Sequence, residues 1–350
     1  MGFISEVITP AELTGFVREE VTGGLPFEAI FPEQAVDDIV YELENVDLTG
    51  FNEVARYRTW DTVPPIGRRP GIALIGGEIP PLGFGYRLNE QDLGRLGKVR
   101  QGIAERTDQR VVDIIYNDAR RAANAVQNRV TLTHGQLLST GSVVLSELGN
   151  VAANQGVQAT FAIPANQLNV VPGVLWSNRA TSTPLDNFVD SETIYSDNNN
   201  GLYPDEWWIS RAAATDLRLS QQLRDMTDHV RSPSRITDAD VAQILDEFGV
   251  QGRIRIVDVR RPPLAGGGRQ PVLPVRTVMG VRAGMGATLF GVPPIVNVME
   301  GNARIELRYA PGLIAYAWDE IRPSPAAFTF CEGVAIPVLT DPAGLFIAQV

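Results

Sequence analysis

The spacing of apolar residues predicts one very long helix in the middle of the chain. From about Thr107 to Leu138, apolar side chains recur every three or four residues, which places them near one helix face. They are Val111, Ile114, Ile115, Ala119, Ala122, Val126 and Val130. At about 1.5 Å per residue, such a helix would span about 50 Å, longer than most helices of single domains. A helix of this length cannot bury its apolar face by itself.

Residues 51–90, which precede this helix, show a different pattern. Short apolar runs, such as Val54 to Trp60 and Ile72 to Ile75, alternate with five prolines and six glycines. This pattern predicts a long, twisted two-stranded hairpin that projects as an arm. A lone hairpin is marginally stable in water, so an arm of this size is expected to lie on another surface. Assembly is therefore the first functional question that the sequence raises.

The remaining pattern predicts an α+β protein. The expected strands are Ser142–Leu145, Val157–Ile163, Ile254–Val259, Val275–Val281, Ile305–Tyr309, Leu313–Trp318, Val334–Leu339 and Leu345–Val350, and the expected helices are Pro184–Ile194, Ser210–Met226 and Asp238–Phe248. Thr237 is suited to cap the last of these helices, and Gly249 is suited to end it. Residues Pro32–Leu43 are interpreted as a solvated amphipathic helix.

Composition is that of an ordinary soluble chain. At 350 residues and 44% apolar content, the protein can bury a large core. There is no run of about 18 apolar residues and no basic, apolar start, so we expect neither a membrane span nor secretion through a signal peptide. The single cysteine, Cys331, cannot form an intrachain disulfide, and its apolar surroundings predict a small buried core residue.

Charge is unevenly distributed along the chain. Residues 1–50 hold eleven acids and one arginine, whereas residues 51–90 hold four acids and five arginines. Complementary charge steers association, so an acidic N-terminal arm is expected to meet the basic arm of another copy at Arg56, Arg58, Arg68 and Arg69. The alternative is that the acids form the solvated face of the helix expected at Pro32–Leu43. Lys98 is the only lysine, which nearly excludes lysine nucleophiles and lysine cross-links.

The sequence offers little for catalysis. Histidine supplies most acid-base and metal sites, yet only His134 and His229 are present, and neither has a metal-ligand spacing. Both are predicted to be structural or solvent-exposed. The glycine clusters at residues 83–85 and 280–291 lack the third glycine of a dinucleotide loop, and the second lacks the lysine of a phosphate-binding loop.

Other candidate groups are better explained by structure. Three adjacent carboxylate pairs stand at positions 205–206, 246–247 and 319–320, but adjacency does not place two carboxyls across a substrate. Trp207 and Trp208 follow a proline turn in an apolar run and are predicted to pack in the core. We therefore predict no catalytic residue, no cofactor and no metal site, and the absence of a basic stripe gives no support to sequence-specific nucleic-acid binding.

Three stretches, taken in their order along the chain, carry a family resemblance. They are GQLLSTGSVVLSEL followed by VQATFAIP at the end of the long helix, LYPDEWWISRAAATDL from residue 202, and the ending APGLIAYAWDEIRPSPAAFTFCEGVAIPVLTDPAGLFIAQV. In this order the chain resembles the major capsid protein of tailed bacteriophages with the Hong Kong 97-type fold. Within that group it is most similar to the lambda-like major capsid protein E family.

The resemblance implies a division into parts. Residues 1–50 would be the N-terminal arm, 51–90 the extended loop, 91–195 with 310–350 the peripheral domain, and 196–309 the axial domain. It implies a non-enzymatic shell protein that forms hexamers and pentamers around packaged double-stranded DNA, assembled in the host cytoplasm and located in the virion. A portal and a decoration or cement protein would be further partners.

Two departures from other capsids of this fold shape the expectation. Some join neighbours through a lysine of the extended loop, but residues 51–90 contain no lysine, so the resemblance implies a non-covalent shell. Others begin with a scaffolding segment of roughly 100 residues, and its absence implies a separate scaffold protein. Each extended loop is expected to lie across an adjacent subunit, which it contacts through Trp60, Ile66, Ile72 and Leu74 and through its four arginines.

Two alternatives stay open at this point. A bacterial nanocompartment shell has the same fold and encloses an enzyme instead of DNA. A hydrolase on a two-domain α+β scaffold would use one of the carboxylate pairs, although two histidines and no recognisable nucleophile argue against it.

Overall fold

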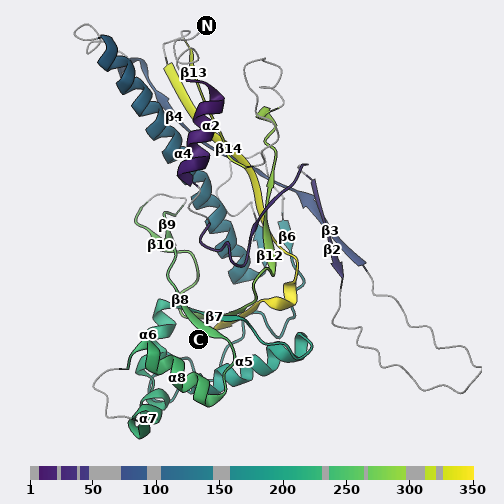
Figure 1. The fold of residues 1–350 in the computed structure, drawn as a ribbon. Coiled ribbons are helices and arrows are strands. Elements are labelled where there is room, and N and C mark those ends of the chain that lie inside the picture. The colour runs from purple at the N-terminus through teal and green to yellow at the C-terminus, as the bar shows by residue number, and fades with distance from the viewer. Residues whose placement is uncertain are drawn as a thin grey trace, which may run out of the picture.

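The computed structural model describes residues 8–21, 25–37, 40–46, 72–92, 104–144, 158–230, 236–263, 267–296, 312–320 and 326–350. Within these residues the chain forms an elongated upper body, a lower body below it, and a two-stranded ribbon that projects to one side (Figure 1). The upper and lower bodies are named here for their positions in that view.

A long helix and a long strand run together through the upper body. Helix α4 (Ala104–Thr140) has 37 residues and strand β14 (Ala326–Leu339) has 14, which correspond to lengths of about 55 Å and about 48 Å. The predicted helix is confirmed and extends slightly beyond both predicted ends. Its apolar face is buried, as expected, at Ile115, Ala119, Ala122, Val126 and Val130.

Strand β14 is the centre of a five-stranded sheet. It pairs antiparallel with β13 (Ile314–Glu320), β4 (Pro81–Leu88) and β12 (Gly286–Gly291), and β1 (Glu33–Ala35) joins β12 in parallel. Because β13 and β4 both pair with residues 327–332, they lie on opposite edges of β14. The helix interpretation of residues 32–43 is wrong, since strand pairing at β1 and at β2 (Val40–Val46) overrides the amphipathic pattern.

Helix α2 (Pro10–Val21) packs against β13 and α4. The Thr14 hydroxyl accepts a hydrogen bond from the Ala315 N–H at 3.1 Å and donates to the Ala315 carbonyl at 3.0 Å. Arg18 Nε donates to the Leu313 carbonyl at 3.0 Å. These bonds satisfy backbone groups at the edge of β13 that would otherwise lack partners. The same core contains Cys331, which is fully buried as predicted, and burial raises the pKa of its thiol to about 12.

The ribbon consists of β2 and β3 (Ile72–Glu78), which pair antiparallel from Val40 opposite Glu78 to Val46 opposite Ile72. The run Ile72–Ile75 is a strand of the arm, as expected, but its partner comes from within residues 1–50. The other predicted run, Val54–Trp60, lies outside the described residues. Tyr41 joins the base of the ribbon to the core, with Gly77 leaving space for its ring.

The lower body is a four-stranded sheet with helices packed around it (Figure 1). The strand order is β15 (Phe346–Gln349), β11 (Thr277–Val281), β7 (Glu206–Ser210) and β8 (Arg253–Val257). Its helices are α5 (Pro184–Asn198), α6 (Arg211–Leu219), α7 (Gln221–Val230) and α8 (Asp238–Phe248). Trp207 and Trp208 are buried in the two main cores, which confirms their predicted packing role.

The helix expected at Ser210–Met226 is two helices. Ser220 adopts an extended conformation, with φ −64° and ψ 146°, and its hydroxyl accepts a hydrogen bond from the Leu223 N–H at 3.4 Å. Serine therefore caps α7 at the point where α6 ends. Helix α8 matches its prediction, with a capping box at Thr237 and a left-handed Gly249 at its end.

Two pairs of short strands complete the described elements. Strand β5 (Ser142–Val144) pairs with β6 (Gln158–Thr160), in agreement with the predicted strands there. Strand β9 (Arg260–Arg261) pairs with β10 (Gln270–Pro271) beside α4. The strand expected at Ile305–Tyr309 lies outside the described residues.

Several elements cross the expected part boundaries. Strand β4 lies in the range 51–90, which was expected to project as an arm, but it pairs with β14 in the upper sheet. Strand β12, from the range 196–309, belongs to the upper sheet. Strand β15, from the range 310–350, and most of α5, from the range 91–195, belong to the lower body. The turn between β11 and β12 and the turn between β14 and β15 are two of the places where the chain passes between the bodies, after the first passage between β6 and α5.

A matched pair of helical glycines tests the packing of α4. A Cβ on Gly135 would lie 2.3 Å from Val272 Cγ1 and 2.7 Å from the Val272 carbonyl oxygen, whereas a Cβ on Gly15 in α2 meets nothing within 4 Å. Alanine is favoured over glycine inside a helix by about 0.5–1 kcal/mol, so Gly15→Ala is expected to raise the free energy of unfolding by that amount. Gly135→Ala is expected to lower it by about 1–3 kcal/mol because Val272, the residue after β10, must move.

Chemical denaturation of the unassembled variants measures both changes. An equal stabilisation by the two substitutions would contradict the close approach of Val272 to α4.

Candidate assembly surfaces

The predicted contact residues fall mostly beyond what the structure describes. Arg56, Arg58, Trp60, Ile66, Arg68 and Arg69 lie outside the described residues. Ile72 and Leu74 lie on β3, opposite Val46 and Glu44, and their side chains are not described. Their role as contacts with another subunit stays a prediction.

The ribbon itself is a candidate assembly surface. Among the described strands, β2 and β3 pair only with each other. A two-stranded ribbon is marginally stable alone, and its outer edges offer unpaired backbone groups to another chain. Figure 1 shows the ribbon leaving the body beside β12 and β6. The geometry therefore supports the expected arm, with a start inside residues 40–46.

A row of aromatic rings covers one face of the upper sheet, and we call it the aromatic row: Tyr316, Trp318, Phe328 and Phe330. It is largely an internal packing feature, because Tyr316 is buried and packs in one core with Val296. Neighbouring rings are stacked with centroids 5.0–6.3 Å apart. Side chains alternate along a strand, so the row lies on the sheet face opposite Ala315, Ala327 and Cys331, which pack toward α2 and α4.

Strand β4 shapes the floor of the aromatic row. Gly85 lies opposite Phe330, and a Cβ there would come 2.4 Å from the Phe330 ring. The Arg87 guanidinium lies 5.6 Å from the centre of the Phe328 ring, within cation–π range. The row was not predicted from the sequence, although a signal for it was present. An aromatic residue recurs two positions later in each strand, at 316 and 318 and at 328 and 330, which places both rings on one face of that strand.

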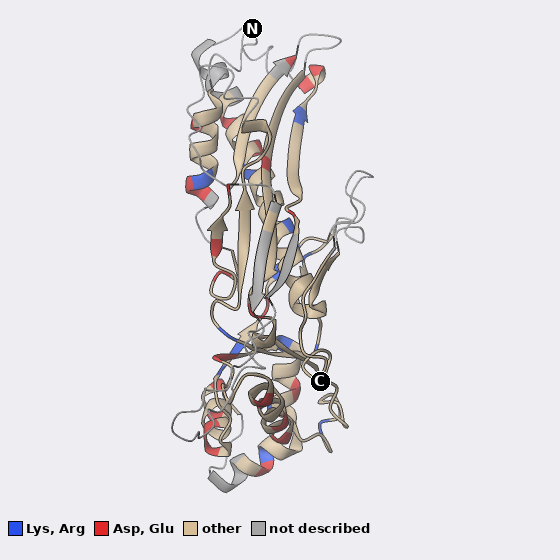
Figure 2. Ribbon diagram, turned by 90° about the vertical axis from the view of Figure 1, so that its right-hand side faces the viewer, with Lys and Arg blue, Asp and Glu red and all other residues tan. Residues whose placement is uncertain are grey.

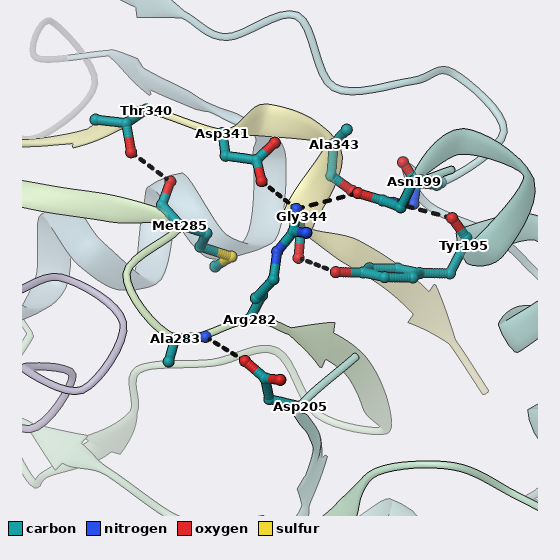
Figure 3. A network of polar contacts seen from close by, with 11 residues as sticks. Tyr195, Asn199, Asp205, Arg282, Ala283, Met285, Thr340, Asp341, Ala343 and Gly344 are labelled. Atoms are coloured by element: carbon teal, nitrogen blue, oxygen red, sulfur yellow. Dashed lines mark hydrogen bonds and ion pairs between the residues drawn. The ribbon is translucent and has the colours of Figure 1, made fainter. Parts of the chain in front are cut away.

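A polar network joins two turns that connect the upper and lower bodies, the turn after β11 and the turn after β14 (Figure 3). Arg282, in the turn after β11, pairs with Asp341, in the turn after β14, and donates to Asn199 Oδ1 at 3.2 Å. The Asn199 side chain in turn donates to the carbonyls of Tyr195 at 2.9 Å and Ala343 at 2.8 Å. Helix α5 is thereby bound to both crossing segments.

Backbone contacts reinforce this network. Tyr195 Oη donates to the Gly344 carbonyl at 3.2 Å, and burial raises the pKa of this phenol to about 12. The Met285 carbonyl accepts the backbone N–H groups of Thr340 and Asp341 at 3.0 Å and 2.9 Å. Bonds between buried groups are costly to break without replacement, so the network favours one fixed angle between the bodies.

His134 is a structural residue, as predicted. It is fully buried where α4, β12 and residues 25–32 meet, with ring centres 4.9 Å from Phe31 and 5.8 Å from Phe27. The Thr288 hydroxyl donates to the Phe31 carbonyl at 3.2 Å, so it accepts from His134 Nε2 at 2.9 Å. Burial lowers the pKa of His134 to about 4. For His229, the structure describes only the backbone, within α7.

The carboxylate pairs carry structural bonds. Asp205 accepts the Ala283 N–H at 2.9 Å, and Glu206 accepts Trp208 Nε1 at 2.7 Å. Glu247 accepts the Gln243 side chain at 2.8 Å. The Asp319 side chain is not described, and its neighbour Glu320 is exposed. Within the described part of the chain, no group of three His, Cys, Asp or Glu side chains could hold a metal ion.

Glu192 is among the buried carboxylates that were not singled out from the sequence. Glu192 of α5 is 5% exposed, accepts the Gln251 N–H at 2.6 Å, and has a pKa raised by burial. It lines a pocket of about 300 Å³ together with Asp197 and Tyr203. Its bond joins α5 to the segment before β8, which is a structural role. Among the described helices, none has both the length and the apolar content to span a bilayer.

Comparisons with known proteins agree on the fold. No family model and no curated protein sequence matches the chain. The structure is similar to a crystal structure described as a prophage capsid protein of Escherichia coli CFT073, with a TM-score of 0.61, 12% identity, and coverage of 98% of this chain and 99% of that one. It is also similar to a phage-related protein of Bordetella bronchiseptica RB50, with a TM-score of 0.51, 14% identity, and coverage of 96% and 95%.

The chain therefore has the Hong Kong 97-type phage capsid fold over nearly its whole length. This confirms the fold class expected from the sequence. At these identities the likeness establishes the fold alone, so membership of the lambda-like branch stays a prediction.

The buried histidine predicts an acid-sensitive core. His134 has a pKa of about 4 in the folded protein and an ordinary value of about 6.5 when unfolded. The contribution of neutral His134 to the free energy of unfolding is complete above pH 6.5. It is lost as the pH falls toward 4, because the unfolded chain then binds a proton that the folded chain does not bind. The loss reaches about 3 kcal/mol.

Denaturant unfolding between pH 7.5 and 4.5 measures this effect, with His134→Gln as the reference because glutamine can still donate to Thr288. The wild type is expected to lose more stability on acidification than the variant. If the free energy of unfolding changes with pH by the same amount in the wild type and in His134→Gln, His134 does not titrate in a buried site.

Proposed function

We propose that this protein is a phage major capsid protein that assembles into the icosahedral head shell. The observation that carries the proposal is the capsid fold over 98% of the chain. The projecting ribbon and the exposed strand edges support it because they are surfaces that a monomer leaves without partners. Asp205, Glu206 and Glu247 of the candidate carboxylate pairs accept structural hydrogen bonds, so a structural role fits their geometry better than hydrolysis.

In the proposed shell, the expected parts take separate roles. The range 51–90 acts as an extended loop carried by the β2–β3 ribbon, and it lies across an adjacent subunit. The elongated upper body corresponds to the peripheral domain and the lower body to the axial domain, near the centre of each hexamer or pentamer. Many weak contacts of this kind combine into a stable particle through avidity.

The proposed partners follow from the same role. The shell encloses double-stranded DNA without sequence-specific contacts, and a separate scaffold, a portal and a decoration or cement protein complete the virion. Neighbours are held without covalent links, since residues 51–90 contain no lysine.

Imaging of the purified protein tests the proposed function. Negative-stain electron microscopy of the chain, with and without its scaffold, is expected to show shells, capsomers or tubes. Boiling these particles in detergent is expected to release single chains. A monomer at all concentrations, with hydrolytic turnover, would favour the hydrolase, and a ladder of linked chains would contradict the non-covalent shell.

The charge of the arm is tested separately. Replacing Arg56, Arg58, Arg68 and Arg69 by glutamate is expected to block assembly while the monomer stays folded, because the reversed arm repels the acidic N-terminal segment. Replacing the same four residues by lysine keeps the charge and is the matched control. An unchanged shell yield for the glutamate variant, measured by sedimentation, would rule out the electrostatic contact.

A further inference from the structure

A buried carboxylate of the lower body holds two arginines that come from distant parts of the chain. Asp216 of α6 is 2% exposed. Its Oδ1 accepts hydrogen bonds from Arg179 Nε at 3.0 Å and Nη2 at 2.8 Å, and its Oδ2 accepts one from Arg276 Nε at 2.8 Å. We call Arg179 and Arg276 the arginine pair. Two positive charges share one negative charge, so the site keeps a net positive charge that attracts an anion.

The arginine pair reaches the protein surface. The side chains of Arg179 and Arg276 are 47% and 46% exposed. Within the part of the chain that is described, the two terminal nitrogens of Arg276 have no hydrogen-bond partner. Because Asp216 fixes the direction of both guanidinium groups, their remaining N–H groups are preorganised as donors. A carboxylate is the planar anion that such donors bind best among protein side chains.

The backbone at Arg276 is left-handed. Its φ is 58°, a conformation that is uncommon for a residue other than glycine. The Arg276 carbonyl accepts the Val350 N–H at 2.9 Å, and the Thr277 N–H donates to Ser210 Oγ at 3.1 Å. The surrounding structure therefore imposes this turn, whose backbone would suit glycine better. An arginine at such a position indicates a role for its side chain.

An apolar pocket lies beside the arginine pair. Its volume is about 230 Å³, and its lining includes Trp176, three residues before Arg179, and Val350, whose N–H binds the Arg276 carbonyl. Both views of the molecule place the C-terminus, and with it Val350, in the lower body (Figures 1 and 2). The pocket is smaller than the roughly 300–1,000 Å³ that drug-sized ligands occupy, so it suits a single apolar side chain.

The segments that carry the arginine pair also expose apolar side chains. In the described residues, nine large apolar or aromatic side chains are more than one-third exposed, and four of them belong to these segments. They are Val171, Val174, Leu175 and Val275. A concentration of exposed apolar groups next to a pocket is typical of a surface that binds a partner.

The surroundings of the arginine pair are acidic. Helices α5 and α8 each contain four carboxylates and no basic residue, and Figure 2 shows that acidic residues, in red, predominate on the helices of the lower body. One of these acids, Asp190, lines the pocket. An incoming carboxylate is therefore repelled by the α5 side of the pocket and attracted to the arginine pair, which sets the direction of a bound segment.

We propose that the arginine pair and the adjacent pocket form a docking site for a short segment of a different protein, in which a carboxylate stands next to a large apolar residue. The carboxylate binds the two guanidinium groups while the apolar side chain enters the pocket. A nucleic acid would supply phosphates for the arginines but no apolar side chain for the pocket. The site is complete in one copy, so this inference goes beyond the proposed shell function and does not depend on it.

Selection from a random peptide library on the unassembled, full-length protein tests the preferred ligand. The enriched peptides are expected to carry Asp or Glu within two residues of a large apolar residue. One such peptide is then labelled, and its Kd is measured by fluorescence anisotropy. Replacing its acid by the corresponding amide, or its apolar residue by alanine, is expected to weaken binding by at least about tenfold.

Two variants of the protein test the site itself. Arg276→Gly removes one guanidinium and fits the left-handed turn, and Val171→Glu places a negative charge on an exposed residue of the pocket lining. Each is expected to weaken peptide binding by at least about tenfold. The matched control is Arg121→Ala on α4, which removes an arginine whose side chain is 69% exposed in the upper body. It is expected to leave the Kd unchanged, and circular dichroism establishes that all three variants are folded.

Each remaining outcome has a definite meaning. A library without acidic and apolar enrichment overturns the docking site, and so does an unchanged Kd in Arg276→Gly. If Arg276→Gly instead abolishes binding of a labelled DNA duplex, or reduces shell yield while no peptide binds, the arginine pair serves nucleic acid or a second copy, and the proposal is wrong. A wild type that binds the peptides but forms no shells overturns the proposed function alone.

Discussion

The packing of α4 along β14 is the interaction on which the rest of the structure depends. At the centre of the contact the side chains are small: Ala119, Ala122 and Ala123 from the helix, and Ala327 and Cys331 from the strand, all at most 2% exposed. Small side chains let a helix and a strand approach closely over a long distance. The result is a thin, extended body whose surfaces are large relative to its core.

Because the upper body is thin, the junction must fix its angle to the lower body. Two of the turns that cross between the two bodies are bound to each other and to α5 by Arg282, Asp341 and Asn199. A shell requires each copy to present its surfaces at nearly the same angle, since errors accumulate around a closed ring. The polar network adds to the apolar core at this junction, which joins Met279, Val281 and Ile347 of the lower sheet to Leu289 and Ile336 of the upper sheet.

The sequence predicted the parts of the fold that follow from local pattern. The α4 periodicity, the Thr237 cap and the burial of Trp207 and Cys331 were all readable because each depends on neighbours along the chain. The failures were long-range. Strand β1 looked helical because its pairing with β12 lies more than 250 residues away in sequence, and the ribbon partner of β3 was missed for the same reason.

The candidate site shows the same limit. Composition indicated an acidic protein, but it gave no sign of the polar network at Arg282, whose partners Asp341 and Asn199 are far apart in the sequence. The aromatic row likewise needs the register of β13 with β14. Net charge and residue counts are averages over the whole chain, so they do not distinguish surfaces that face different neighbours. The fold is needed to assign charged residues to separate surfaces.

The central claim is that this chain works as one of many copies held by weak, repeated contacts. Its most direct test is the mass distribution of the purified protein, measured by mass photometry or sedimentation across a range of concentrations and salt. The account predicts a cooperative change from free chains or single capsomers to large closed particles, weakened by high salt. A single species with the mass of one chain under every condition would contradict it.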